Sequence, residues 1–142
     1  TTHLSIGQEA SGVPAVMALE DGDLVTLTHR GHAMSIGMGI DLNKMMAELM
    51  GKATGFCKGK GGSMHIVDVD AGNLGSNGVV GGGLTLAPGA ALTQKYKKTG
   101  KIVLCSFGDG ASNEGSFHEG VNLSSVWNVY TSYKSNERKK CC

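Results

Sequence analysis

The stretch "KIVLCSFGDGASNEG", Lys101 to Gly115, decides the fold class of this chain. Residues 101–107 form an apolar run without polar alternation, which is typical of a strand buried on both faces of a parallel sheet. Residues 113–128 then place Phe117 and Val121 four positions apart, which indicates a helix packed on that sheet. Asp109, between two glycines, is therefore expected at the carboxyl end of a parallel strand, where α/β sheets bind ligands.

Similar patterns on either side of this stretch extend the prediction to most of the chain. They predict helices at residues 6–20, 41–51 and 84–98 and a short strand at residues 23–29. Residues 54–83 show neither period and are expected to form a long ordered loop, a kind of segment that is usually functional. The alternation of helices and strands predicts an α/β layered fold.

Two of the predicted helices are expected to bury apolar faces. The face of the first consists of Ile6, Ala10, Val13 and Met17, and the face of the second consists of Leu42, Met45, Met46 and Leu49. Asp41 is expected to cap the second helix and Gly51 to end it. Pro14 is expected to kink the first helix or mark a later start, and Pro88 is expected near the start of the third.

Composition argues against several classes of function. The formal net charge of +1 gives no electrostatic argument for binding nucleic acid or an anionic membrane, and no apolar run approaches the roughly 18 residues of a membrane span. The four cysteines form no C-x-x-C pair, which argues against a zinc or disulfide framework and favours a reducing compartment. The 23 glycines against 2 prolines favour a backbone that approaches a ligand closely or adopts positive φ.

Glycine-based nucleotide motifs and a zinc site do not fit the sequence. The segments around Lys52 and Lys60 fail the P-loop pattern, and no G-x-G-x-x-G follows a predicted strand. His29 and His32 lie three positions apart in "HRGH", but no acidic third ligand is near them. A polar loop is therefore favoured over a metal site at this position.

Asp109, Arg30 and His65 are the remaining candidates for chemistry, and spacing alone leaves each of them open. Asp109 suits a divalent cation such as Mg2+ beside a helix N-terminus that binds phosphate, but Asp-Gly is also common in plain turns. Arg30 suits recognition of phosphate, and a surface charge is equally consistent with its position. His65 lies in the predicted loop, where an isolated histidine is more often structural than catalytic.

Five motifs in a fixed order make the chain resemble a known family. "GDGASNEGSFHEGVNLSSVWN" resembles the thiamine diphosphate motif in the alpha subunit of the decarboxylating component of 2-oxo acid dehydrogenases. "HLSIGQEA", "THRGHA", "GKGGSMHI" and "NGVVGGGLTLAPGAAL" agree with the same family, over about residues 1–128. The residues of these motifs are most similar to the acetoin dehydrogenase branch of the family, and the pyruvate dehydrogenase subunits are nearly as similar. The resemblance implies a parallel-sheet thiamine diphosphate-binding α/β fold that is incomplete, with N- and C-terminal parts missing.

The resemblance also implies roles for the residues that match. It implies that Asp109 binds the Mg2+ that anchors the diphosphate of the cofactor. The other implied cofactor-binding residues are His29, Arg30, Gly78, Val80, Gly108, Gly110 and Ala111. Among these, Arg30 is expected on the diphosphate, and Gly78 and Val80 under the cofactor rings. His3, near the entrance of the site, and His65 are the implied catalytic histidines.

The implied activity is that of a thiamine diphosphate- and Mg2+-dependent oxidoreductase subunit. Such a subunit cleaves acetoin or decarboxylates a 2-oxo acid and passes the acyl unit to a lipoyl acyltransferase partner. The resemblance further implies a beta subunit in an alpha2beta2 heterotetramer, which supplies a glutamate that activates the cofactor. This chain alone is therefore expected to be inactive, and a bacterial cytoplasmic location is expected.

The agreement with the family stops after Asn128. The family continues with an apolar strand and an asparagine pair that completes the Mg2+ site, whereas this chain continues "VYTSYKSNERKKCC", which is too polar for a buried parallel strand. Arg138 stands where the second asparagine is expected, and nearby Asn136 receives no role. We therefore expect a partial thiamine diphosphate-binding domain at residues 1–128 and a divergent tail at 129–142. A truncation or frameshift is favoured over a genuine terminus.

Two other functions stay open at this point. A degenerate alpha-subunit fragment could act only as a binding or assembly module, without catalysis. An unrelated Mg2+-dependent phosphate-ester enzyme that uses Asp109 would need further carboxylates at strand ends, and the other aspartates do not have such positions. The lost second metal ligand also predicts weak or no cofactor binding by the isolated chain.

Overall fold

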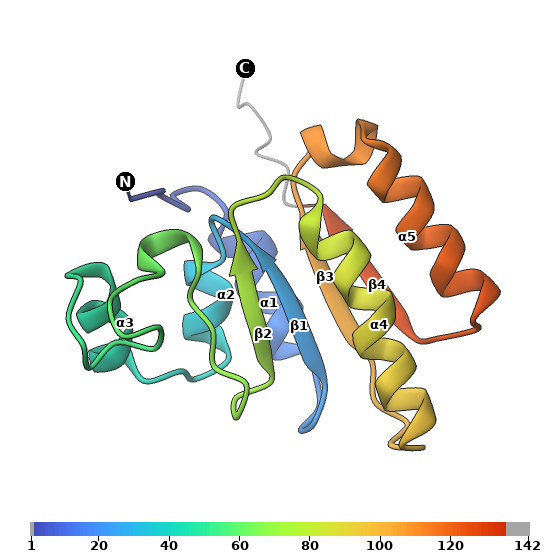
Figure 1. Ribbon diagram of the computed structural model, residues 1–142, viewed down its shortest axis with the longest axis horizontal. Helices are drawn as coiled ribbons and strands as arrows, with labels where there is room; N and C mark the ends of the chain where they lie inside the picture. Colours follow the sequence, from blue (N-terminus) through green and yellow to red (C-terminus); the bar gives the residue numbers. More distant parts are fainter. Residues whose placement is uncertain (1, 136–142) are drawn as a thin grey trace.

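The computed structural model describes residues 2–135, and its centre is a four-stranded parallel sheet with the strand order β2-β1-β3-β4. The strands are Leu24–Thr28 (β1), Asn73–Asn77 (β2), Val103–Phe107 (β3) and Thr131–Ser135 (β4). The helices are Glu9–Met17 (α1), His32–Gly37 (α2), Leu42–Leu49 (α3), Gly82–Tyr96 (α4) and Gly115–Val126 (α5), with short 3-10 turns at Gly62–Met64 (η1) and Gly110–Asn113 (η2). All strands point the same way in Figure 1, which confirms the predicted parallel α/β fold.

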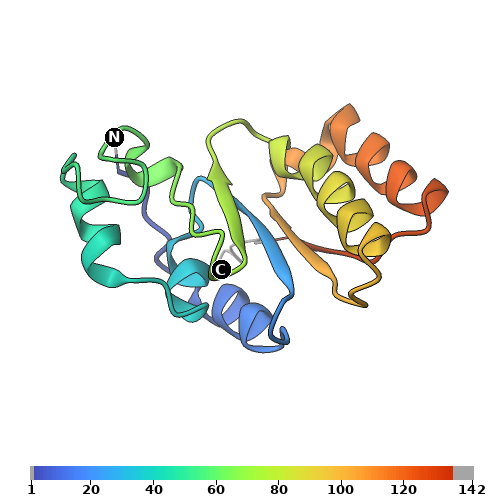
Figure 2. The same ribbon diagram turned by 60° about the horizontal axis from the view of Figure 1, so that its bottom comes forward.

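Helices cover both faces of the sheet (Figure 2). The core beneath α4 and α5 consists of Leu84, Ala87, Ala91, Val103, Cys105, Phe107 and Ala111. The core beneath α1 and α2 consists of Val16, Val25, Leu27, Met34 and Leu104. Successive residues of β3 thus belong to opposite cores, and every residue of this strand is buried. Residues 103–107 of the run at 101–107 therefore form a strand buried on both faces, as predicted.

The connections that leave β1 and β3 diverge at the carboxyl edge of the sheet. After β1 the chain enters α2, which packs with α1 on one face. After β3 the chain enters η2 and α5, which pack with α4 on the opposite face. Because β1 and β3 are neighbours, this divergence opens a crevice between their carboxyl ends, which is where open α/β sheets bind ligands.

The buried face of α1 differs from the predicted one. The helix begins at Glu9, after a turn at Gly7 with a φ of 83°, and it continues through Pro14. Ile6 and Met17 are exposed, whereas Gly12 and Val16 are buried. The predicted face was wrong because α1 packs on α2 through its smallest residue: a Cβ on Gly12 would lie 3.0 Å from Cγ of Met34.

The face of α3 is likewise only half as predicted. Asp41 caps the helix as expected, since its side chain accepts hydrogen bonds from the backbone N–H groups of Asn43 and Lys44. Met45 is buried, but Leu42 and Met46 are about half exposed, at 53% and 50%. The second buried position of α3 is a carboxylate, Glu48, and hydrophobic periodicity cannot identify a buried charge.

Pro88 lies inside α4 rather than near its start. α5 packs against α4 at the turn where the proline removes a backbone hydrogen bond. A proline has no N–H to donate to the carbonyl four residues earlier, which here is the carbonyl of Leu84. Gly120 of α5 packs against this carbonyl so closely that a Cβ on Gly120 would lie 2.3 Å from the oxygen. The two helices therefore cross where α4 has lost a hydrogen bond and α5 has no side chain.

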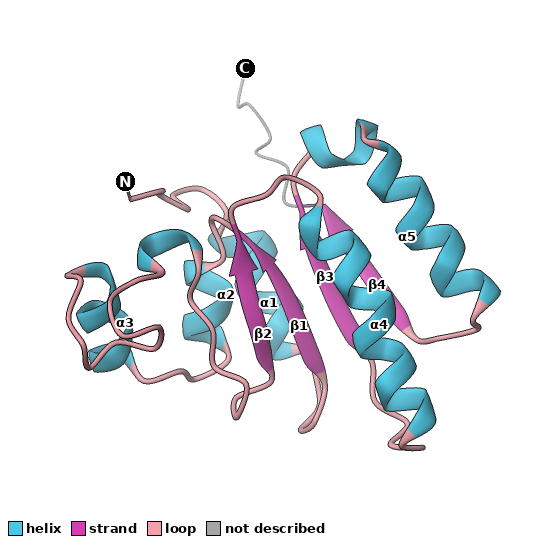
Figure 3. Cartoon of the chain, in the orientation of Figure 1, coloured by secondary structure: helices cyan, strands magenta, loops and turns pink. Residues whose placement is uncertain are grey.

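The segment predicted as one long loop contains the edge strand β2. Figure 3 shows that a loop follows α3 and that β2 comes after it, beside β1. The sequence of β2, "NLGSN", lacks apolar alternation, which is why the strand was missed. A polar contact stabilises it instead, because the buried side chain of Asn73 donates a hydrogen bond to the hydroxyl of Ser35 at 3.0 Å.

The polar segment after Asn128 adds β4 to the sheet as its outermost strand. The segment pairs in parallel with β3, but its residues are half-buried or exposed, in agreement with the expectation that it is too polar for a buried parallel strand. Tyr133 attaches it to α5, since its hydroxyl bonds to the hydroxyl of Ser124 at 2.7 Å and to the carbonyl of Gly120 at 3.0 Å. Asn136 and Arg138 lie outside the described residues, and the predicted boundary at 128 stays a prediction.

Two further sequence expectations concern cysteines and membranes. Cys57 and Cys105 are free thiols, and burial raises the pKa of Cys105 to about 11. Within residues 2–135, no helix combines the length and apolar character needed to cross a bilayer. Cys141 and Cys142 fall outside the described part of the chain.

Candidate functional site

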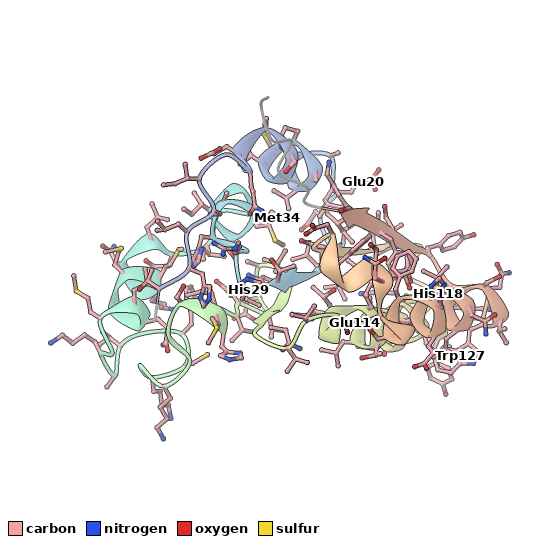
Figure 4. All side chains as sticks on the ribbon, turned by 90° about the horizontal axis from the view of Figure 1, so that it is seen from above. Glu20, His29, Met34, Glu114, His118 and Trp127 are labelled. Carbon is pink, nitrogen blue, oxygen red and sulfur yellow. The ribbon has the colours of Figure 1, made fainter. Side chains whose placement is uncertain are left out.

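A cleft of about 250 Å3 lies in the crevice between the carboxyl ends of β1 and β3. Its lining comes from the turn before α1, the ends of β1 and β3, the loops after β1, β2 and β3, and the start of α4. The lining residues are Gln8, Leu27, Thr28, His29, Arg30, Asn77, Val79, Val80, Gly81, Gly83, Leu84, Ser106, Phe107, Gly108, Asp109, Gly110 and Ala111. Figure 4 looks down on this edge of the sheet, with His29 near the middle and Glu114 toward α5.

The loop after β3 gives the cleft an exposed carboxylate between two small residues. Asp109 is exposed, and within residues 2–135 its carboxylate has no hydrogen-bond or ion-pair partner. Its carbonyl accepts hydrogen bonds from the side chains of Ser112 and Asn113, which fix the turn into α5. A Cβ on Gly108 or Gly110 would meet no atom within 4 Å, so these glycines leave space in the cleft rather than satisfy packing.

The loop after β1 gives the cleft its cationic side. The guanidinium of Arg30 donates a hydrogen bond to the carbonyl of Leu4 and so joins this loop to the N-terminal segment. The imidazole of His29 stacks edge-on against His3, with ring centroids 4.8 Å apart. Burial is the largest cause that lowers the pKa of His29, and the neighbouring His3, Arg30 and His32 lower it further. His29 is therefore neutral near pH 7.

The N-terminus of α4 opens into the same cleft. Its N-cap, Gly81, has a φ of 75°, no side chain caps the helix through a hydrogen bond, and the helix has no acidic residue in its own first turn. The carboxylate of Glu114 lies beside the N-cap, since a Cβ on Gly81 would be 2.9 Å from its Oε2. The backbone N–H groups at a helix start and the helix dipole both favour an anion. Asn77 shapes the loop before it, because its side-chain oxygen accepts a hydrogen bond from the N–H of Val79 at 2.8 Å. Val80 follows and is 51% exposed at the cleft.

Seven of the ten predicted site residues line the cleft. These are His29, Arg30, Val80, Gly108, Asp109, Gly110 and Ala111. Gly78 lies behind the lining, where a Cβ would be 3.5 Å from Nε2 of His65. His65 itself is exposed and does not line the cleft, and His3 reaches it only through its contact with His29. The geometry thus supports seven positions and leaves the roles of all ten as predictions.

Sequence reasoning missed several lining residues for identifiable reasons. Asn77 and Gly81 follow β2, which was not predicted, so nothing placed them at the carboxyl edge of the sheet. An Asn two positions before a valine, next to glycines, is nevertheless a recognisable turn pattern. Gln8 lines the cleft from the turn before α1, and only the tertiary fold brings it there.

The donor atoms of the cleft are too few to bind a metal ion by themselves. They fit a metal ion only if a bound ligand supplies further oxygen atoms. Within the described residues, no three His, Cys, Asp or Glu side chains gather closely enough to hold a metal ion. Mg2+ commonly uses one or two carboxylates, several waters and the oxygens of a phosphate ligand. The single carboxylate of Asp109, beside an uncapped helix N-terminus, fits that arrangement and does not fit a site built from protein ligands alone.

Comparison with known proteins identifies the family of this chain. Residues 1–131 match the model of the family described as dehydrogenase E1 component. The alpha subunit of acetoin:2,6-dichlorophenolindophenol oxidoreductase from Bacillus subtilis is 61% identical over 127 residues, which cover 89% of this chain and 38% of that relative. The subunit of the same name from Cupriavidus necator is 49% identical over the same shares of both chains.

A pyruvate dehydrogenase subunit is also similar. The pyruvate dehydrogenase E1 component subunit alpha from Rickettsia prowazekii is 41% identical over 127 residues, which cover 89% of this chain and 39% of that relative. The chain thus spans a little over a third of the length of these relatives. Because the family model covers almost the whole sequence, the chain belongs to the dehydrogenase E1 component family.

Proposed function

We propose that the cleft binds the diphosphate group of thiamine diphosphate together with Mg2+, as part of the alpha subunit of an acetoin or pyruvate dehydrogenase. The observation that carries the proposal is the convergence of three features at one crevice. These are the exposed Asp109 carboxylate, the Arg30 guanidinium and the uncapped N-terminus of α4. Together they provide a metal ligand, a cation and N–H donors, which are the groups that a metal-bound diphosphate requires.

Each side of the cleft would have a separate task. Asp109 would bind the Mg2+, and the metal would offset the negative charge of the diphosphate. Arg30 and the N–H groups at the start of α4 would donate hydrogen bonds to phosphate oxygens. Gly108 and Gly110, with no side chains, would let the ligand approach the backbone. The exposed Val80 would contact an apolar part of the cofactor and exclude water from it.

The chemistry that thiamine diphosphate supplies when bound is a carbon nucleophile and an electron sink for cleavage next to a carbonyl group. This chain would contribute position rather than a nucleophile of its own. The neutral imidazole of His29 lies at the cleft, where its unprotonated nitrogen can accept a hydrogen bond or a proton. His3 adjoins it, and its buried Nδ1 has no hydrogen-bond partner within residues 2–135. We propose that His3 binds a polar group of an incoming substrate, and we assign His65 no more than a supporting position beside Gly78.

The names of the relatives support the wider assignment. On these names we propose acetoin or a 2-oxo acid as substrate and a beta subunit as the partner in a heterotetramer. We also propose a lipoyl group on an acyltransferase as acceptor, which the resemblance described above implies and the names do not mention. The exposed valines Val79 and Val80 at the cleft are consistent with a second subunit that covers the bound cofactor. We also propose that the chain without that subunit does not complete the reaction.

The test is titration of the chain with thiamine diphosphate in the presence and absence of Mg2+, followed by calorimetry and by NMR of backbone amides. We expect weak, saturable binding that requires Mg2+ and that shifts the amide signals of Gly108 and Gly110. Asp109→Asn removes the charge that binds the metal, and we expect it to weaken Mg2+-dependent binding at least about tenfold. Asp70→Asn is the matched control, because Asp70 is exposed at the amino end of β2, on the opposite edge of the sheet.

Two results would contradict the proposal in different ways. Equal binding by the Asp109→Asn variant and the native chain would remove Asp109 from the metal site. Absence of any Mg2+-dependent binding, even at millimolar thiamine diphosphate and with an E1 beta subunit added, would favour the alternative of an assembly module without a cofactor. Tight binding by the chain alone would contradict the expectation that a second metal ligand is missing.

A further inference from the structure

The most completely bonded side chain in the described structure is Glu48, at a distance from the cleft. Glu48 lies in the last turn of α3 and is fully buried. Its Oε2 accepts hydrogen bonds from the N–H groups of Cys57 at 2.7 Å and Gly59 at 2.9 Å. Its Oε1 accepts from the N–H groups of Gly61 at 2.8 Å and Gly62 at 2.9 Å. The segment 57–62 therefore wraps around one carboxylate.

Glycines in and next to the 57–62 segment are required for the backbone to surround the Glu48 carboxylate. A Cβ on Gly55 would lie 2.5 Å from Oε2 of Glu48, and one on Gly59 would lie 2.4 Å from the carbonyl carbon of Gly51. Gly59 and Gly62 also have positive φ values, of 75° and 61°. Burial alone would raise the pKa of Glu48, but the four N–H donors outweigh it and lower the pKa. The carboxylate is thus charged and held by the backbone alone.

The segment that Glu48 holds leads directly to Ser63, in η1. Ser63 is buried, and its hydroxyl accepts a hydrogen bond from the backbone N–H of His3 at 3.1 Å. Nε2 of His32 lies 3.0 Å from both the hydroxyl and the carbonyl of Ser63. Ser63 therefore ties the loop after α3 to the N-terminal strap, which we define as residues 2–8, and to the start of α2.

The N-terminal strap closes one side of the cleft. His3 on the strap stacks against His29, and the carbonyl of Leu4 accepts the hydrogen bond from Arg30. Gln8, at the end of the strap, lines the cleft. The chain of contacts thus runs from Glu48 through the 57–62 backbone to Ser63, to the strap and to the cationic side of the cleft.

We infer that Glu48 is a positioning residue for the cleft: its carboxylate fixes Ser63, and Ser63 fixes the N-terminal strap against His29 and Arg30. The inference rests on the proposed function only in treating this cleft as the site of interest. A buried carboxylate that accepts four N–H bonds has no remaining capacity for a ligand, so Glu48 acts through the loop and not on a substrate.

The test compares Glu48→Gln with Glu20→Gln in the full chain, without any cofactor, by NMR titration of the histidine rings. Gln at position 48 keeps the size but turns an N–H2 group toward N–H donors, so the 57–62 segment should detach. The N-terminal strap would then detach from Ser63, and His29 would lose both its burial and its contact with His3. We therefore expect the titration midpoint of His29 to rise toward the ordinary value of about 6.5. Glu20 is exposed, pairs with Lys101 at the surface and lies well away from His29 in Figure 4, so the His29 midpoint of its variant should match that of the native chain.

Ser63→Ala tests the same chain of contacts at its next link, and it serves if Glu48→Gln does not fold. It removes the hydroxyl that binds the strap but leaves the four bonds to Glu48 in place. We expect the midpoint of His29 to rise while the amide signals of Gly59 and Gly61 stay where they are. An unchanged His29 midpoint in Ser63→Ala, or in a folded Glu48→Gln variant whose 57–62 amides have shifted, would overturn the inference. Because no cofactor is present, failure of cofactor binding leaves this result intact.

Discussion

The two sides of the cleft are stabilised by different kinds of interaction. The side made by β3, α4 and α5 rests on seven buried apolar residues that form one continuous core. The other side rests on the core beneath α1 and α2 and, through the N-terminal strap, on the lobe at residues 40–66, which we call the α3 lobe. The buried apolar cluster of this lobe is small and consists of Ile40, Met45 and Ile66. The α3 lobe compensates with the polar wrap around Glu48. One side should therefore be sensitive to cavities, and the other to loss of charge and of backbone hydrogen bonds.

The largest effect is expected from a cavity in the β3 side. Leu84→Ala removes a fully buried side chain from the centre of the core, and such changes cost about 2–5 kcal/mol. Urea denaturation followed by circular dichroism measures the loss, and it should be the same at pH 7 and pH 5. Leu92→Ala on the same helix is the control, since Leu92 is 39% exposed and should cost much less. Equal losses in both variants would show that the core is not centred on Leu84.

The crossing of α4 and α5 allows a second test on the same side. A Cβ on Gly120 would collide with the Leu84 carbonyl, so Gly120→Ala should destabilise the chain by about 1–3 kcal/mol. Gly89→Ala, inside α4, meets no atom within 4 Å and should instead stabilise it by about 0.5–1 kcal/mol. The opposite signs, read from urea midpoints, distinguish a packing role for Gly120 from a general effect of glycine in helices.

The same contrast explains which parts of the fold the sequence could predict. The strand at 103–107 and the helix after it follow from local apolar pattern, because buried apolar residues are what stabilises them. β2 and the buried face of α3 do not follow, because Asn73 and Glu48 are buried through hydrogen bonds to distant partners. A single sequence does not reveal that a polar side chain will find such partners.

The candidate site divides in the same way. Asp109 could be placed at the edge of the sheet because a predicted strand ends just before it. Arg30 could be placed there for the same reason, after β1. Asn77 and Gly81 needed the missed strand β2, and Gln8 needed the tertiary contact of the N-terminal strap. The roles of the matched residues came from the resemblance to a family and not from spacing, which had left Asp109 and Arg30 open.

Acid should open the α3 lobe before the β3 side. The pKa of Glu48 is lowered in the folded chain, whereas an unfolded glutamate has a pKa of about 4.3. A carboxylate of this kind contributes stability above its unfolded pKa and loses that contribution as the pH falls through its folded pKa. Amide signals of Gly59, Gly61 and Gly62 should therefore collapse only when the pH falls below the pKa of an unfolded glutamate, while those of β3 persist. Glu48→Gln should abolish this separate transition, and its persistence in that variant would assign it to another group.

The smallest effect is expected at the start of α3. Asp41 accepts hydrogen bonds from the N–H groups of Asn43 at 2.8 Å and Lys44 at 3.2 Å, and Asp41→Ala should cost about 1 kcal/mol. Because the α3 lobe has its own small core, we expect this loss to accelerate hydrogen exchange in α3 without changing exchange in β3. Asp41→Asn, which keeps an acceptor at the cap, should lose much less. Equal acceleration in β3 would mean that the lobe and the β3 side unfold as one unit, and the difference between the two sides of the cleft would then be one of composition and not of stability.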